Sequence, residues 1–249
     1  TMAVDRALVQ VEEAFRQRTL KTKASSFMRV LLTMNITWQK ETFHLLPEKA
    51  IHWPAENTLF IADPHFGKTA TFRTAGIPVS DDNSKDDCRK LLALCQQTQS
   101  MKIVFLGDFL HARQGRSESV KNLLLEWRSN CPQLEVHLVR GNHDRQSGDP
   151  WPELEIVCHD EPWILKSWQC RHHPIEGPEL PHLAGHLHPG FALRGKARSG
   201  IRSACFLVSE NRIILPAFGS FTGLMQVKPR QGDRIFMTNE HEIVALPVF

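Results

Sequence analysis

The sequence predicts an α/β fold of two packed β-sheets with helices on the outside. Between residues 57 and 141, three apolar, strand-like runs alternate with two segments of helical periodicity. After residue 150 the helical pattern fades, and short β-type runs follow one another toward the carboxyl end. An apolar fraction of 41% over 249 residues is ample for a packed core.

The first half of the chain reads strand, helix, strand, helix, strand. The strand-like runs lie at 57–62, 101–107 and 134–141, and each ends at a polar cluster. Helical spacing of apolar residues predicts helices over about 81–98 and 117–129, the second with Ser117 as a possible cap. This alternation predicts parallel strand pairing with right-handed crossovers.

The second half is rich in short strands. The β-type runs there are EIVCH at 155–159, WILKSWQC at 163–170, ACFLVS at 204–209, NRIIL at 211–215 and RIFMT at 234–238.

The amino-terminal 33 residues differ in charge from the remainder. They hold six basic and three acidic side chains, which is the whole net charge of +3, so the rest of the chain is neutral. A methionine at position 34 begins a segment that reads like an ordinary protein start. We expect residues 1–33 to be an extension, helical or disordered, and residues 34–249 to form a single domain. Its acidic residues argue against a secretory signal.

The cysteine pattern and the hydropathy of the chain indicate the kind of cellular compartment in which it works. The six cysteines are scattered without a C-x-x-C pair, which argues against thiolate zinc sites and against a disulfide framework. No apolar run approaches the ~20 residues that span a bilayer. The sequence therefore predicts a cytoplasmic protein with no membrane partner.

Polar residues with metal-binding side chains follow several of the predicted strands. Because loops beyond the carboxyl ends of strands converge on one crevice in α/β sheets, these side chains can meet. The candidate ligands are Asp63, His65, Asp108, Asn142, His172, His186 and His188.

Carboxylate, amide oxygen and imidazole suit first-row divalent ions, so we expect manganese, with iron and zinc as alternatives. Seven ligands are too many for one catalytic ion with an open position, whereas two ions could share Asp108 and clamp a phosphoester. His143 is then left to bind a phosphoryl oxygen or to protonate the leaving group.

Five blocks stand in a familiar order: D-x-H at 63–65, G-D at 107–108, G-N-H-D at 141–144, H-x-P at 172–174 and G-H-x-H at 185–188. This order resembles the calcineurin-like metallophosphoesterase superfamily. The resemblance implies a four-layer α/β/β/α sandwich of two mixed sheets with a dinuclear centre. It implies that Asp63, His65 and His188 hold one ion and that Asn142, His172 and His186 hold the other. Asp108 would lie between the two ions, and His143 would lie next to them without binding either. His173 remains an alternative to His172.

Segments 62–79, 106–113, 184–190 and 215–223 further resemble the ligase-associated DNA damage response endonucleases. The likeness covers 34–249 and departs at Pro64 and Leu224, neither of which is a ligand. It implies a DNA endonuclease of bacterial DNA repair, associated with an ATP-dependent DNA ligase and a helicase. The alternative is a phosphodiesterase or phosphatase of small molecules, and a third class is a non-catalytic interaction module.

Candidate substrate contacts are Arg73 and Arg113, together with Asn142 and His143 of the G-N-H-D block. The segment 190–203 carries four basic residues and no acid, and it is either a solvated loop or a cationic path for a phosphate backbone. His111 and His182 lie near the blocks, and we expect them to support the site or the fold rather than to bind metal.

Overall fold

The computed structural model describes residues 33–74, 76, 82–177, 179–194 and 200–247. The predicted extension at 1–33 therefore lies outside the described residues except for Thr33, and so do Lys196 and Arg198 of the basic segment.

The first sheet has seven strands in the order β1-β2-β3-β4-β5-β6-β7. Their bounds are Met34–Trp38, Glu41–Leu46, Ala50–Trp53, Thr58–Ile61, Lys102–Phe105, Glu135–Val139 and Ile156–His159. The strands β1 to β4 pair antiparallel, and β4 to β7 pair parallel, which confirms the predicted parallel pairing. The antiparallel strands β1, β2 and β3 were not predicted. Tight turns join them, with positive φ at Gln39, Lys40 and Lys49.

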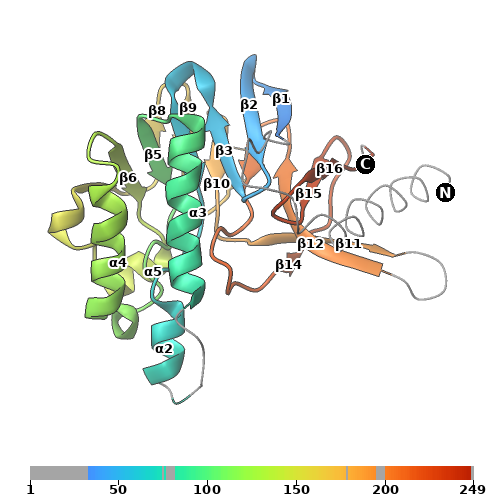
Figure 1. Cartoon of the computed structure of the whole chain (residues 1–249). Coiled ribbons are helices and arrows are strands. Elements are labelled where there is room, and N and C mark those ends of the chain that lie inside the picture. Colours follow the sequence, from blue (N-terminus) through green and yellow to red (C-terminus); the bar gives the residue numbers. More distant parts are fainter. Residues whose placement is uncertain (1–32, 75, 77–81, 178, 195–199, 248–249) are drawn as a thin grey trace, which may run out of the picture.

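The described helices lie in the connections between strands β4, β5, β6 and β7 of the first sheet. Their bounds are Lys68–Thr74 for α2, Asp82–Thr98 for α3, Glu118–Ser129 for α4 and Asn142–Ser147 for α5. Three short 3₁₀ turns lie at Pro54–Glu56, Arg113–Gly115 and Pro152–Leu154. The Ser117 hydroxyl accepts a hydrogen bond from the Val120 amide, so the predicted cap begins α4. Figure 1 shows α3 and α4 side by side over one face of this sheet. None of the described helices is both long and apolar enough to cross a membrane.

The second sheet has nine strands. Seven of them follow the order β14-β11-β12-β13-β10-β9-β8, while β15 pairs with β12, and β16 pairs with β15. The bounds of β8 to β16 are Trp163–Leu165, Trp168–Cys170, His182–Ala184, Pro189–Arg194, Gly200–Val208, Arg212–Ile214, Met225–Gln226, Arg234–Thr238 and Ile243–Ala245. The run 163–170 is a hairpin rather than one strand, since β8 and β9 pair antiparallel. Part of the basic segment is β-strand, because Gly190–Arg194 of β11 pair with Gly200–Ala204 of β12.

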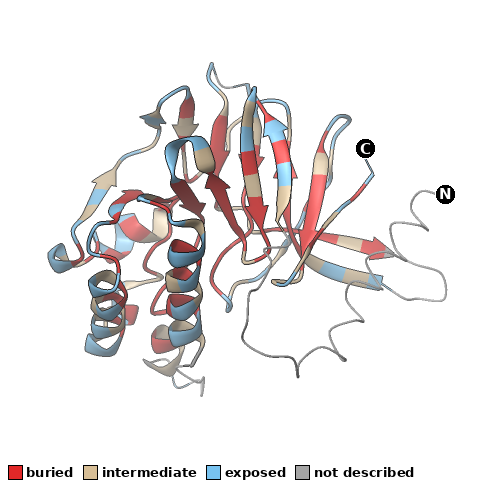
Figure 2. Cartoon of the chain, turned by 45° about the horizontal axis from the view of Figure 1, so that its top comes forward, coloured by how far each residue is buried: buried red, intermediate tan, exposed pale blue. Residues whose placement is uncertain are grey.

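Three apolar clusters hold the layers together. The first joins α3 and α4 to the first sheet, and the second lies between the sheets, with Phe60, Val104 and Phe206 fully buried. Figure 2 shows the buried residues concentrated on the strands. The third cluster covers the outer face of the second sheet, and none of its residues comes from a described helix. The fold is the predicted α/β sandwich of two mixed sheets, with its described helices on the first.

Candidate metal centre

All seven predicted ligands lie together beyond the carboxyl ends of strands from both sheets. Asp63 and His65 follow β4, Asp108 follows β5, and Asn142 begins α5 directly after β6. His172 follows β9, and His186 and His188 follow β10. The strands β4, β5 and β6 are parallel neighbours, so their ends open on the same edge of the sheet. The second sheet supplies its histidines to that edge.

The backbone at the centre is unusual. Five of the seven residues have positive φ, which is uncommon for any residue but glycine and costs about 1–3 kcal/mol each. They are Asp63 (50°), His65 (48°), Asp108 (52°), His186 (67°) and His188 (46°). Hydrogen bonds hold two of these turns: the His65 amide donates to the Asp108 carbonyl at 2.9 Å, and the His186 amide donates to Asp63 Oδ2 at 2.8 Å. Strain of this kind is typical of functional sites.

Two motif glycines are needed for close approach. A Cβ added to Gly107 would lie 2.1 Å from His172 Nδ1, and one added to Gly141 would lie 2.3 Å from Asp108 Oδ1. Gly107 also has φ of 86°, a conformation that side chains rarely adopt. The glycine of G-D thus makes room for His172, and the glycine of G-N-H-D makes room for Asp108.

Asp63, His65 and His188 form one compact group of potential ligands. Their ligand atoms all lie within 4.8 Å of one another. His65 Nε2 is 3.4 Å from His188 Nε2, which in turn is 3.6 Å from Asp63 Oδ1. Asp63 Oδ1 is buried and has no hydrogen-bond partner among the described residues. A buried carboxylate oxygen without a donor fits a site that is completed by a cation.

Asn142, His172 and His186 form a second group. His172 Nε2 lies 3.0 Å from Asn142 Oδ1 and 3.0 Å from His186 Nδ1. Asp108 lies between the two groups: its Oδ1 is 3.5 Å from His172 Nε2, and its Oδ2 is 3.7 Å from His65 Nε2. Each carboxylate oxygen of Asp108 therefore faces a different group, as a bridging ligand requires.

The geometry separates His172 from its neighbour His173. His172 is fully buried, and its Nδ1 lies 3.0 Å from the Leu106 carbonyl, to which it donates, so Nε2 faces the centre as an acceptor. His173 Nδ1 lies 2.6 Å from Glu161 Oε1, and its side chain is 40% exposed. His172 is thus the ring that lies between Asp108 and Asn142.

His143 lies beside the two groups and is partly open to solvent. Its amide donates to Asp108 Oδ1 at 3.0 Å, and its Nδ1 lies 2.6 Å from the His111 carbonyl. A carbonyl only accepts, so Nδ1 carries the proton, and Nε2 points toward the centre, 3.9 Å from Asp108 Oδ2. This ring can exchange a proton or a hydrogen bond with a group bound there.

His111 packs against the centre, and its ligand atom lies within 4.8 Å of those of His65 and His143. Its Nδ1 lies 3.3 Å from His65 Nδ1, and its ring stacks on that of His143 with centroids 4.9 Å apart. The other predicted support, His182, is buried in β10, where its Nε2 accepts from the Ile175 amide at 3.4 Å.

Of the two arginines predicted to contact substrate, Arg113 donates its Nε to the Gln146 carbonyl at 2.8 Å, at the end of α5. Arg73 lies half-buried in the last turn of α2. The hydrogen bond of Arg113 joins it to α5 and not to a predicted ligand.

Sequence reasoning missed two carboxylates that position the ligands. Glu161 Oε2 accepts from the amides of His172 and His173, each at 2.9 Å. Asp144, the last residue of G-N-H-D, accepts from the Gly141 amide at 2.9 Å and from the Leu110 amide at 3.2 Å. The motif carries a signal for Asp144, whereas Glu161 lies eleven residues before His172 and no spacing rule connects them.

Burial shifts the protonation of the centre. It raises the pKa of Asp108 to about 8, and the nearby charge of Asp63 adds to the rise. Burial also lowers the pKa of His65 to about 2 and that of His172 to about 4. Without cations, the centre therefore favours neutral groups. Bound cations would reverse this preference at Asp108.

The metal-free protein should lose stability as the pH rises, because of Asp108. Its pKa is about 8 when folded and 3.8 in its ordinary state, so its contribution is present below pH 3.8 and is lost as the pH rises to 8. Asn cannot ionise, so the Asp108→Asn variant should not lose this contribution. The free energy of unfolding of the variant minus that of wild type should therefore increase by more than about 1.4 kcal/mol from pH 5 to pH 8. Urea unfolding with a chelator at both pH values measures this. A constant difference would contradict the assigned shift.

A family model and solved structures match this chain. The calcineurin-like phosphoesterase family matches residues 57–190. The crystal structure of the nuclease MPE of Pseudomonas putida is 34% identical, with a TM-score of 0.75, and the match covers 86% of this chain and all (100%) of that one. YfcE, a phosphoesterase from E. coli, is 17% identical with a TM-score of 0.33, over 77% of this chain and 98% of that one. Among curated proteins, none matches.

Proposed function

This chain belongs to the calcineurin-like phosphoesterase family, and on that premise we propose that it is a dinuclear metal-dependent phosphodiesterase that cleaves DNA as an endonuclease. The observation that carries the proposal is the position of Asp108. Its two carboxylate oxygens face separate groups of ligands, at 3.5 Å from His172 Nε2 and 3.7 Å from His65 Nε2. A single-ion site would have no use for this arrangement.

The donor set fits two divalent ions. One ion would be held by Asp63, His65 and His188, and the other by Asn142, His172 and His186. Oxygen and imidazole donors without thiolate favour manganese, with iron or zinc as alternatives. Such ions, when bound, withdraw electrons from a phosphoryl group and acidify water.

His143 supplies the proton chemistry of the proposed reaction. When water attacks phosphorus, the bond between phosphorus and the leaving oxygen breaks, and that oxygen needs a proton. His143 Nε2 faces the centre while Nδ1 is fixed on the His111 carbonyl at 2.6 Å, so the ring is oriented to deliver one. Its partial exposure lets the ring regain a proton from solvent.

The choice of DNA as substrate rests on similarity to a nuclease at 34% identity over 86% of this chain. A role in DNA repair, in association with an ATP-dependent DNA ligase and a helicase, is part of the proposal and rests on the sequence resemblance. Arg73 and Arg113 remain candidate contacts for the phosphate backbone.

The test is an assay of manganese-loaded protein on single-stranded DNA, duplex DNA and an aryl phosphodiester. We expect internal cleavage of circular or end-blocked DNA, and cleavage that stops when a chelator removes the metal. Hydrolysis of the aryl diester without cleavage of either DNA would favour the small-molecule alternative. Inactivity on all three substrates with metal bound would contradict the proposed activity.

A further inference from the structure

Phe221 exposes an aromatic ring beside the centre. Phe221 is 43% exposed and lies on the loop that follows β13. The ring makes an edge contact with Phe72, at 5.4 Å between centroids. The Phe72 ring lies roughly parallel to that of His111, with centroids 6.5 Å apart, and the His111 ring stacks on that of His143, with centroids 4.9 Å apart. A series of packed rings thus leads from the surface to the group proposed to donate the proton.

The loop that carries Phe221 is fixed on both sides of it. Asp87 accepts from the Ser220 amide at 3.1 Å and from the Ser220 hydroxyl at 2.6 Å. The Thr222 hydroxyl donates to the Gly219 carbonyl at 2.9 Å. Gly219 packs so closely that a Cβ there would lie 2.4 Å from the Pro64 carbonyl oxygen. Since Pro64 separates the ligands Asp63 and His65, Phe221 has a set position relative to them.

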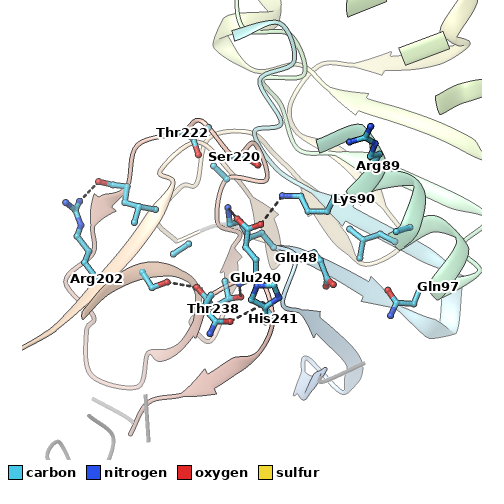
Figure 3. A pocket seen from close by; sticks show the side chains of 18 of the residues that line it. Glu48, Arg89, Lys90, Gln97, Arg202, Ser220, Thr222, Thr238, Glu240 and His241 are labelled. Atoms are coloured by element: carbon cyan, nitrogen blue, oxygen red, sulfur yellow. Dashed lines mark hydrogen bonds and ion pairs between the residues drawn. The ribbon is translucent and has the colours of Figure 1, made fainter. Parts of the chain in front are cut away.

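Two hollows lie near the Phe221 ring, one at the centre and one farther from it. A small cavity is lined by the ligand His65, by Lys68 and by Phe221. Ser220 and Thr222, the residues on either side of Phe221, line a separate groove of about 1180 Å³ that extends along α3 from Arg89 to Gln97 (Figure 3). Lys90 and Lys49 in this groove share Glu240, so much of its positive charge is already paired.

An aromatic ring on a fixed loop is suited to stacking, because it meets its partner without losing further conformational freedom. We propose that Phe221 stacks on the nucleobase next to the scissile phosphate and thereby favours nucleotide substrates over other phosphodiesters. The inference rests on the proposed phosphodiesterase activity. Lys68, in the cavity shared with His65, lies on the side where the phosphate would be held, and the groove leaves room for the nucleotides beyond the stacked base.

Two esters with the same leaving group test this directly: the p-nitrophenyl ester of thymidine 5′-phosphate and methyl p-nitrophenyl phosphate. Phe221→Ala should lower kcat/KM about 5- to 100-fold on the thymidine ester, the range expected for loss of one base–aromatic stack. Activity on the methyl ester should stay unchanged, and Phe221→Trp should keep the preference for the thymidine ester. Met101→Ala is the control. Met101 is similarly exposed (51%) but lies directly before β5, at the end of that strand opposite to Asp108.

Equal loss on both esters, or no loss on either, would overturn the stacking role while leaving the hydrolase intact. Fluorescence anisotropy of a labelled oligonucleotide with metal-free protein is a second readout that needs no turnover. Phe221→Ala should bind the oligonucleotide about 5- to 100-fold more weakly than wild type. If wild type hydrolyses neither ester, its cleavage of single-stranded and duplex DNA decides whether the proposed activity holds, and the binding measurement decides whether Phe221 contacts a base.

Discussion

Replacing Asp108 with alanine is expected to abolish phosphodiester hydrolysis and to reduce the metal that the protein binds. Both proposed ions lose a shared anionic ligand, because each carboxylate oxygen of Asp108 faces a different ligand group. Residues that only support a ligand typically change affinity or activity about 10- to 100-fold, so the loss at Asp108 should exceed about 100-fold. Turnover of an aryl diester and elemental analysis of the purified variant measure the two effects.

Unfolding would be the trivial cause of such a loss, and the metal-free protein controls for it. Asp108 is almost fully buried near Asp63, and burial raises its pKa to about 8. Removing the carboxylate relieves this unfavourable burial, so the metal-free Asp108→Ala variant should show no large drop in melting temperature above pH 8. A variant that keeps near wild-type turnover would contradict the bridging role.

Replacing His143 with alanine should reduce turnover by roughly 10²- to 10⁴-fold, the usual range for a positioned proton donor, while both ions remain bound. The backbone amide of His143, which donates to Asp108, is kept in the alanine variant, and the ring approaches Asp108 only to 3.9 Å through Nε2. The ring also meets that of His65 edge-on, with centroids 5.0 Å apart, so metal analysis of the variant is part of the test. The loss should be smaller for p-nitrophenyl esters than for DNA, because p-nitrophenolate leaves without a proton. Rates on the two substrates, measured with the same metal-loaded protein, give the comparison.

A loss of one ion from His143→Ala would make His143 a ligand instead of a proton donor. His111→Ala is a useful companion, since its ring packs on His143 while its carbonyl, which fixes His143 Nδ1, belongs to the backbone and is retained. It should lower turnover less than His143→Ala does.

The seven candidate ligands could be found from the sequence because each lies within four residues after the end of a strand. Parallel strands such as β4, β5 and β6 bring their carboxyl ends to one edge, so neighbouring blocks such as D-x-H and G-D meet without any knowledge of loop structure. The order of the five blocks then fixed the family, which matches residues 57–190.

Other features depend on contacts that sequence spacing does not encode. Glu161 precedes β8 and His172 follows β9, so the two residues meet only because β8 and β9 form a hairpin. The sequence pattern of 163–170 predicts one strand there instead of a hairpin. The strands β1 to β3 were missed because their turns at Gln39–Lys40 and Lys49 use positive φ without glycine. The path from Phe221 to His143 joins residues from two loops and two helices that are far apart in the sequence, and only packing reveals it.

Anomalous X-ray diffraction from manganese-soaked crystals, at the manganese absorption edge, tests most directly whether two ions share Asp108. We expect two peaks on either side of the Asp108 carboxylate. One should lie within ligand distance of Asp63, His65 and His188, and the other within ligand distance of Asn142, His172 and His186. A single peak, or a second peak away from Asp108, would contradict the dinuclear centre.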